Sequence, residues 1–265
     1  MPFDRIFKDQ MGRTVQISWP PRRIISVVPS QTELLFELSL GQSIIGITKY
    51  CVHPHEQVKQ AAKVGGTKQL NIPLIKELKP DLIIANKEEN ERSQIEELAE
   101  HFPVWISDIT DLDDAINMIG SVGEITDRSE QANALITVIR KGFGALQPIK
   151  QRIRVAYFIW RKPYMVAGKD TFIDHMLAVC GFENVFTTSR YPQITPEELT
   201  EAAPQLIFLS SEPYPFREKH MDEFAALVPK AKIQLVDGEM FSWYGSRLQY
   251  APAYFESLVD MVDVK

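Results

Sequence analysis

The stretch that decides the fold is TDRSEQANALITVIRKGFGALQPI, residues 126–149, near the middle of a 265-residue chain. Its apolar residues recur every three or four positions and so mark one helix face: Ala132, Leu135, Ile136, Ile139, Phe143 and Leu146. Asp127 and Glu130 have the spacing of a capping box, and Pro148 marks the end. Since it has no His, no Cys and no acidic residue beyond its first turn, we expect one long helix that connects and does no chemistry.

Strand and helix patterns alternate on both sides of this helix. The predicted strands of the sheets are 23–28, 44–47, 82–85 and 104–106 before it, and 153–160, 206–210 and 233–236 after it. Alternation at this spacing indicates parallel, doubly wound sheets. We therefore predict an α/β fold of two doubly wound β/α lobes with mostly parallel sheets, joined by a single long α-helix. The expected boundaries are 1–125 for the N-terminal lobe, 126–149 for the connecting helix and 150–265 for the C-terminal lobe.

An internal repeat supports two related lobes. ELKPDLIIANKE (77–88) and EAAPQLIFLSSE (201–212) share a helix end, a Pro, an apolar strand and a Glu eight residues after the Pro.

Composition excludes several classes of function. Hydrophobic residues at 45% and charged residues at 24% describe an ordinary globular protein. The net charge of −6 argues against a nucleic-acid partner, and no apolar run is long enough to insert in a membrane. The N-terminal residues lack the pattern of a secretory signal, which leaves open whether the protein stays in the cell or has lost a signal.

Candidate binding residues follow the predicted strands, because ligands of open α/β sheets bind beyond the carboxyl ends of strands. They are Ser30, Gln31, Tyr50, Asn86, Trp160, Arg161, Tyr164, Tyr214, Trp243 and Tyr244. Thr32 is expected to cap the helix that follows the first of these strands. The aromatic rings suit a large, flat, partly apolar ligand. In the alternative, Trp243 and Tyr244 fill a lobe interface, and Trp160 and Arg161 form a structural pair.

Enzyme motifs are absent, and no catalytic residue is predicted. The chain has no G-x-S-x-G, no P-loop, no H-E-x-x-H and no G-x-G-x-x-G after its first strand. Cys51, His53 and His55 have a spacing that could bind a bare metal ion, which we keep as an alternative to a structural or ligand-contacting role.

Four segments, in order, resemble the cobalamin-binding substrate-binding proteins of ABC importers, a class that also carries ferric siderophores and haem. They are RIISVVPSQTELLFELSLGQSIIGITKY (23–50), KELKPDLIIA (76–85), AGKDTFIDHMLAVCGFENVF (167–186) and SRYPQITPEEL (189–199). The resemblance runs from about Arg22 to Leu258. It implies two α/β lobes joined by a long helix, with a corrinoid or related metal chelate bound between them and no catalytic cofactor.

The resemblance also implies roles for single residues. Tyr50 matches a corrin-contacting tyrosine, Trp243 lies beside a C-lobe contact, and Glu197 matches a glutamate that docks on the permease. His53 is a candidate axial ligand of the metal. The implied partner is a membrane ABC permease, the implied location is the periplasm or cell envelope, and we expect a monomer.

Some positions depart from the family pattern. Pro73 stands where an N-lobe docking glutamate is expected, and Thr67 and Asn86 replace two tryptophans of the cleft. Glu212 and Glu239 add acid near the site, which disfavours an anionic ferric siderophore. One alternative is a ferric-siderophore or haem binding protein of the same fold. The missing secretory signal and Pro73 suggest the other alternative, a cytoplasmic corrinoid carrier or enzyme of the same fold.

Overall fold

The computed structural model describes residues 3–263 and divides into two compact units. Unit 1 comprises the chain up to Ile109 together with Asp113–Arg140 and Tyr244–Arg247. Unit 2 comprises Thr110–Leu112, Lys141–Trp243 and the chain from Leu248 onward. Each unit has its own sheet and its own hydrophobic core, in agreement with the predicted α/β class.

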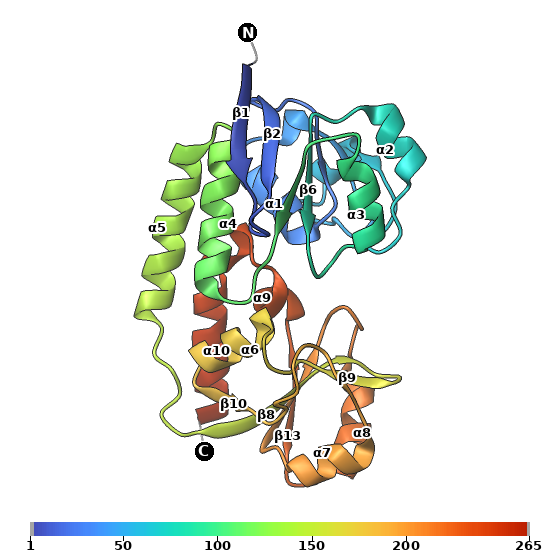
Figure 1. The fold of residues 1–265 in the computed structure, drawn as a ribbon. Coiled ribbons are helices and arrows are strands. Elements are labelled where there is room, and N and C mark those ends of the chain that lie inside the picture. The colour runs from blue at the N-terminus through green and yellow to red at the C-terminus, as the bar shows by residue number, and fades with distance from the viewer. Residues whose placement is uncertain (1–2, 264–265) are drawn as a thin grey trace. The chain divides into compact units, whose positions relative to one another are not determined.

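Unit 1 contains an antiparallel hairpin and a five-stranded parallel sheet of order β5-β4-β3-β6-β7 (Figure 1). The strands are β1 (Phe3–Lys8), β2 (Thr14–Trp19), β3 (Ile24–Ser26), β4 (Ile44–Ile47), β5 (Ala62–Lys63), β6 (Leu82–Asn86) and β7 (Val104–Ser107). Every residue of β3 and β6 is buried. Continuous burial is typical of parallel strands covered by helices on both faces.

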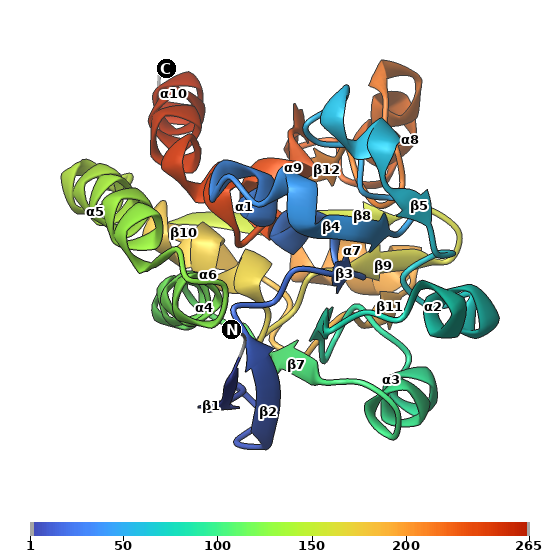
Figure 2. The ribbon, with the colours of Figure 1, turned by 90° about the horizontal axis from the view of Figure 1, so that it is seen from above.

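Helices cover the sheet of unit 1 on both sides. They are α1 (Pro29–Glu37), α2 (Ile72–Leu78), α3 (Arg92–Ala99), α4 (Leu112–Ile125) and the first part of α5 (Ser129–Ala145), with 3-10 turns at Gly41–Ser43 and Gln57–Gln60. Ile75 of α2 and Ile95 of α3 pack on Ile25 and Ile83 of the strands. α4 lies on the opposite side of the sheet (Figures 1 and 2). The carboxyl ends of the strands therefore emerge together at one edge.

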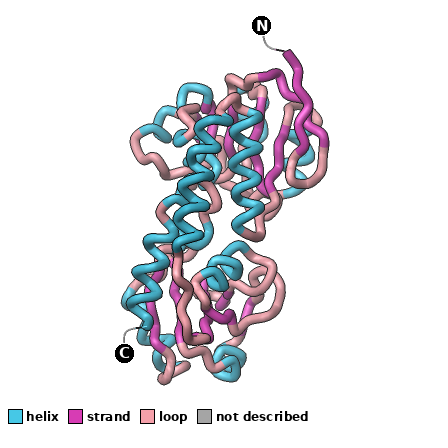
Figure 3. Tube along the Cα trace, turned by 90° about the vertical axis from the view of Figure 1, so that its left-hand side faces the viewer, coloured by secondary structure: helices cyan, strands magenta, loops and turns pink. Residues whose placement is uncertain are grey.

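The helix expected at 126–149 is shorter than predicted. Asp127 has a φ of 58°, and the N–H of Arg128 donates to the carbonyl of Gly123 at 2.7 Å, so residues 126–128 close α4 and do not begin α5. α5 ends at Ala145, and residues 146–150 are not helical. The two helices run side by side (Figure 3), and a Cβ on Gly123 would lie 2.4 Å from the Cβ of Ala132.

Unit 2 contains a six-stranded mixed sheet. Its main path is β11-β9-β8-β12-β13, and β10 pairs with the first residues of β8. The strands are β8 (Ile153–Trp160), β9 (Tyr164–Val166), β10 (Phe182–Asn184), β11 (Gln193–Ile194), β12 (Leu206–Ser210) and β13 (Lys232–Val236). β8, β10, β12 and β13 are parallel, whereas β9 and β11 pair antiparallel.

Both faces of this second sheet are also covered. The helices are α6 (Phe172–Val179), α7 (Pro196–Ala202), α8 (Met221–Leu227), α9 (Gly238–Ser242) and α10 (Ala251–Asp263), with 3-10 turns at Glu218–His220 and Ser246–Gln249. Leu199 of α7 and Phe224 of α8 belong to the core on one face. On the other face, the ring of Phe241 in α9 lies 5.1 Å from Tyr157 and 4.8 Å from Phe255 of α10.

The repeat seen in the sequence is a repeat of structure. α2 and α7 each carry Pro in the first turn and end at a left-handed residue, Lys79 with φ 47° and Ala203 with φ 42°. A Pro and a five-residue parallel strand, β6 or β12, then follow in each unit. The match extends to the turn after the strand, where the side chains of Asn86 and Ser210 each accept the N–H two residues later.

Unit 1 also contains a short segment from the C-terminal part of the chain. Tyr244–Arg247 belongs to unit 1, while the residues on either side belong to unit 2. The chain therefore passes between the units at this segment and at Thr110–Leu112 as well as along α5, whereas a single helical connection was expected.

Candidate ligand-binding site

The predicted residues Ser30 and Gln31 lie in the first turn of α1, which begins at Pro29 rather than after Thr32. Thr32 bonds inward, since its hydroxyl donates to the carbonyl of Val28 at 2.9 Å. Ser30 and Gln31 are buried, and Nε2 of Gln31 donates to Oγ of Ser107 at the end of β7. Oγ of Ser30 and Oε1 of Gln31 have no hydrogen-bond partner among the described residues.

Tyr50 presents an exposed ring after β4. The residue is 52% exposed, and the ammonium of Lys49 lies 5.0 Å from its ring centroid. A Cβ on Gly66 would lie 3.2 Å from the ring, so this glycine leaves room for the ring edge. An exposed aromatic face at a strand end is the feature that a flat ligand would use.

Cys51, His53 and His55 do not converge on one point. The thiol of Cys51 is buried between the hydroxyls of Thr32 and Thr48, at 3.1 and 3.2 Å, and burial raises its pKa. His55 is exposed and pairs with the neighbouring Glu56. Within residues 3–263 no group of three His, Cys, Asp or Glu side chains is arranged to hold a metal ion.

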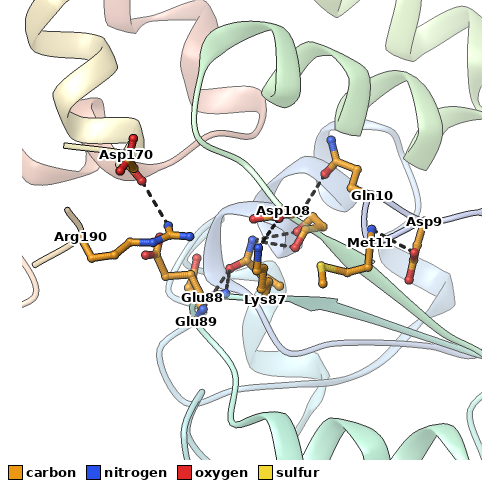
Figure 4. Close-up of polar contacts among 11 residues, drawn as sticks. Asp9, Gln10, Met11, Lys87, Glu88, Glu89, Asp108, Asp170 and Arg190 are labelled. Carbon is orange, nitrogen blue, oxygen red and sulfur yellow. Dashed lines mark hydrogen bonds and ion pairs between the residues drawn. The ribbon is translucent and has the colours of Figure 1, made fainter. Parts of the chain in front are cut away.

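Asn86 organises the loop after β6. Its Oδ1 accepts the N–H groups of Glu88 and Glu89 at 2.8 and 3.0 Å, and its Nδ2 donates to the carbonyl and hydroxyl of Ser107. The side chain is therefore fully used within the lobe. Figure 4 shows the loop of Lys87, Glu88 and Glu89 beside Asp108, to which Lys87 is ion-paired at 2.6 Å.

Tyr244 is buried against the same loop. Its hydroxyl donates to Oε1 of Glu89. The next residue, Gly245, lies against the carbonyl of Ser30, because a Cβ there would be 2.4 Å from that oxygen. The segment is thus built into the strand-end region of unit 1.

Trp160 and Tyr214 form an aromatic pair at the strand ends of unit 2. Their ring centroids are 5.6 Å apart, with an edge-to-face angle of 68°. Trp160 is 38% exposed, and its indole N–H donates to the carbonyl of Lys162. Tyr214 also contacts Phe216 and His220, so one side of the pair is anchored in the core.

Arg161 and Tyr164 share one carboxylate, that of Glu223 in α8. Arg161 donates to Oε2 at 2.6 and 2.9 Å, and Tyr164 donates to Oε1. Burial and the nearby carboxylate raise the pKa of Tyr164 to about 12. Burial alone would raise the pKa of Glu223, but the bonds from Arg161 and Tyr164 outweigh it and lower the pKa.

Trp243 is buried, and its indole N–H donates to Oε1 of Glu212 at 2.9 Å. The hydroxyl of Ser242 donates to the same oxygen. Burial raises the pKa of Glu212, and the negative charge of Glu239 adds to the effect. Trp243 is therefore tied to the loop after β12.

Glu197 is exposed at the second position of α7, directly after Pro196. A bond from its own backbone N–H lowers the pKa of its carboxyl, which keeps it charged. Pro73 is the second residue of α2, so the repeat places Pro73 and Glu197 at equivalent positions.

Residues 24–229 match the model of a family described as periplasmic binding protein. The chain belongs to this family. A periplasmic binding protein carries a substrate and does not transform it, so the prediction of a non-enzyme is confirmed, as is the resemblance noted in the sequence.

Curated and solved relatives agree with this assignment. The vitamin B12-binding protein of Pectobacterium atrosepticum is 28% identical over 200 residues, which cover 71% of each chain. The structure of the periplasmic vitamin B12 binding protein of Vibrio cholerae superposes with a TM-score of 0.76 at 22% identity, over 93% of this chain and 99% of that one. The heme-binding protein RhuT of Roseiflexus sp. RS-1 gives 0.77 at 20% identity, over 90% and 99%. These superpositions confirm the fold.

Several contact residues of this periplasmic binding protein were not predicted. Glu223, Glu89, Glu33 and Arg247 each pair with a residue far away in sequence, and no local pattern marks such pairs. The sequence repeat gave one relevant signal, because the second repeat segment ends at Glu212, which bonds to Ser242 and Trp243. None of the described helices is long and apolar enough to cross a membrane.

Proposed function

We propose that this protein is the substrate-binding component of an ABC importer and that it binds a corrinoid through the strand-end loops of its two units. The observation that carries the proposal is the pair of exposed rings at these strand ends, Tyr50 in unit 1 and Trp160 in unit 2, the latter packed on the half-buried ring of Tyr214. Rings of this kind supply large contact areas to a macrocycle at low entropic cost. The curated relatives named vitamin B12-binding proteins support the same ligand class.

The other predicted residues take supporting roles in this proposal. Asn86 and Tyr244 fix the loop after β6, and Trp243 fixes the loop after β12. Arg161, which directly follows Trp160, and Tyr164 are both bonded to Glu223 of α8. His53 is the proposed axial ligand of the corrinoid metal, and the absorption spectrum of bound cobinamide in a His53→Ala variant tests it.

Charge favours a corrinoid over an anionic siderophore. Glu88, Glu89, Glu212 and Glu239 lie on or next to the strand-end loops. Cobalamin is neutral overall and tolerates these carboxylates, whereas a ferric siderophore with net negative charge would be repelled. Haem, which carries two carboxylates, is the second ligand to test.

Delivery to a membrane permease is the second half of the proposal. Glu197 is exposed and charged on α7, where an arginine of a permease can pair with it. We propose that the protein works as a monomer in the periplasm or cell envelope. A corrinoid carrier in the cytoplasm is the alternative, and it needs no docking at Glu197.

The direct test is ligand binding to the purified protein. Cobalamin and cobinamide should quench tryptophan fluorescence and raise the melting temperature, and Tyr50→Ala and Trp160→Ala should weaken binding. Tyr250→Ala is the matched control, because Tyr250 is 57% exposed but precedes α10 and follows no strand. If the protein binds haem or a ferric hydroxamate but neither corrinoid, the ligand class is different from the one proposed. If it binds none of these four compounds, the proposal is refuted.

A further inference from the structure

Two unpaired side-chain oxygens mark the first turn of α1. Oγ of Ser30 and Oε1 of Gln31 are buried and lack a hydrogen-bond partner among the described residues. Buried polar atoms are almost always bonded, so two unbonded oxygens on neighbouring residues need an explanation. They also belong to the strand-end region in which the proposed function places the ligand.

The surrounding network fixes which atom of Gln31 is unpaired. Oδ1 of Asn86 accepts two backbone N–H groups, so Nδ2 of Asn86 must face Ser107. The hydroxyl of Ser107 accepts from this amide and gives its one hydrogen to the carbonyl of Ala85. With this assignment Ser107 has no hydrogen left to give to Gln31, and Gln31 donates to it through Nε2. Its carbonyl oxygen is the atom left over, and a carbonyl oxygen can only accept.

The helix end adds hydrogen-bond donors beside these acceptors. α1 has nine residues, its cap Val28 has no side chain that can accept, and Pro29 occupies the first helical position. The N–H groups of the first turn have no intrahelical partner and favour a group with negative partial charge. Since the Cα–Cβ bonds of a helix tilt toward its N-terminus, the side chains of Ser30 and Gln31 are directed toward this helix end.

We propose, on the basis of the proposed function, that this turn recognises a primary carboxamide of the ligand. Such a group donates through its NH₂ to Oε1 of Gln31 and accepts through its oxygen from Ser30 or the first-turn N–H groups. Corrinoids carry primary carboxamides around the macrocycle, whereas haem carries carboxylates. A carboxylate has no hydrogen to give to Gln31, so the turn selects the corrinoid class by one hydrogen bond.

The segment Tyr244–Arg247 lies against this turn. Gly245 lies against the carbonyl of Ser30, and the segment is held by Tyr244 on Glu89 and Arg247 on Glu33. Both unpaired oxygens are enclosed in the structure, so entry of the carboxamide requires a local shift of this segment. A single ordered water on the two oxygens is the competing explanation.

Hydrolysed corrinoids provide the test on the wild-type protein. Binding is measured for cobalamin, cobinamide and the set of cobalamin monocarboxylic acids, each with one carboxamide converted to a carboxylate. We expect at least one isomer to bind about tenfold or more weakly than cobalamin, because its carboxylate leaves Gln31 unpaired. Equal binding of all isomers overturns this inference and leaves the proposed function standing, whereas no corrinoid binding overturns both.

Two variants assign the effect to the turn. Gln31→Met and Ser30→Ala should each weaken cobalamin binding by about 5- to 10-fold and reduce the discrimination against the affected isomer. Gln16→Met on the exposed face of β2 is the matched control and should bind as wild type does. If Gln31→Met fails to fold, Ser30→Ala and the wild-type isomer set decide the question. Wild-type affinity in Ser30→Ala with unchanged discrimination, or a water on both oxygens in a corrinoid-bound crystal structure, refutes the inference.

Discussion

Arg247 forms a two-pronged ion pair with Glu33, 214 residues earlier in the chain, with N–O distances of 2.6 and 3.1 Å. Both side chains are mostly buried, at 13% and 16% exposure. Glu33 belongs to α1, the helix whose first turn carries Ser30 and Gln31. The pair therefore fixes a C-terminal segment of the chain on the helix that we propose to contact the ligand.

Removal of this ion pair should destabilise unit 1. Arg247→Ala deletes both bonds to a largely buried carboxylate, and we expect a loss of about 2 to 4 kcal/mol in the free energy of unfolding. Urea denaturation followed by circular dichroism measures it. Arg92→Ala, which deletes an exposed ion pair with Glu96, should produce no measurable change. Equal stability of the two variants would show that the pair is not structural.

Gly245 should not tolerate a side chain. A Cβ at this position would lie 2.4 Å from the carbonyl oxygen of Ser30, so Gly245→Ala must displace the segment or α1. We expect a cost of about 2 kcal/mol or more, measured by thermal denaturation. Gly144→Ala in α5 is the opposite case, because nothing lies within 4 Å of the new Cβ, and it should stabilise by about 0.5 to 1 kcal/mol.

Gly142, two residues before Gly144, is a packing glycine. A Cβ there would lie 2.9 Å from Cγ of Pro252 in α10. Gly142→Ala should therefore gain less stability than Gly144→Ala, or lose some. Glycine also makes a helix easier to open locally, so hydrogen exchange of the α5 amides should slow more in Gly144→Ala than in Gly142→Ala.

The buried carboxyl of Glu212 should make the free energy of unfolding depend on pH. Burial raises the pKa of its carboxyl above the ordinary value of 4.5, so the folded protein holds this proton more tightly than the unfolded chain does. Its contribution therefore favours folding at low pH and is lost as the pH rises from 4.5 through the raised pKa. Glu212→Gln keeps an oxygen for Ser242 and Trp243 and does not titrate, so its stability relative to wild type should increase over the same interval.

Denaturation between about pH 4 and pH 8 measures the effect of Glu212. Glu201→Gln on the exposed surface of α7 serves as control. A constant difference between Glu212→Gln and wild type across this range would contradict the prediction.

Docking on a permease should depend more on unit 2, which carries Glu197, than on unit 1, which has Pro73 at the equivalent position. Glu197→Ala should weaken binding to the partner permease in nanodiscs by about tenfold, whereas Glu201→Ala on the same helix should not. Pro73→Glu places a carboxylate at the equivalent position of α2 and should strengthen binding. An unchanged affinity in Glu197→Ala, with corrinoid binding intact, would favour the cytoplasmic carrier.

The two cysteines should be inert in the native state. Burial raises the pKa of the Cys51 thiol and raises that of Cys180 to about 12, so neither forms a thiolate readily. Both should react with a thiol reagent only after unfolding. Fast native reaction of Cys51, or a stoichiometric bare metal in elemental analysis of the purified protein, would revive the metal-ion receptor alternative.

Local patterns predicted the parts of the fold that local interactions determine. The repeat at 77–88 and 201–212 correctly predicted two helix–Pro–strand units. It could do so because the helix end, the proline and the apolar strand each depend on only a few neighbouring residues. The predicted boundaries of α5 were wrong because they depend on contacts outside the local sequence. Asp127 has the sequence signature of a helix cap, but it adopts the left-handed conformation in the turn that ends α4. Gly123, which has no side chain, allows α5 to pack closely on α4 near this turn.

The sequence named candidate site residues by their positions after strands and gave less information about what each side chain does. The strand-end rule named Tyr50, Trp160 and Tyr214 as candidates, and in the structure the first two rings are exposed while Tyr214 is half-buried. It did not distinguish them from Asn86, Trp243 and Tyr244, whose polar atoms bond within their own units. That distinction depends on partners such as Glu89 and Glu212, which only the folded chain brings near.

The placement of Tyr244–Arg247 has a consequence for synthesis. A ribosome completes the sheet of unit 1 when it has made β7, yet Glu33 and Glu89 then still lack Arg247 and Tyr244, which emerge only after nearly all of unit 2. Unit 1 is therefore translated first but cannot reach its final form until most of unit 2 has been made; only the chain from Leu248 onward, with α10, follows this segment. For the same reason, a gene fragment that ends at the α5 boundary should give a less stable N-terminal half, and lobes exchanged between relatives would need to carry this four-residue segment with them.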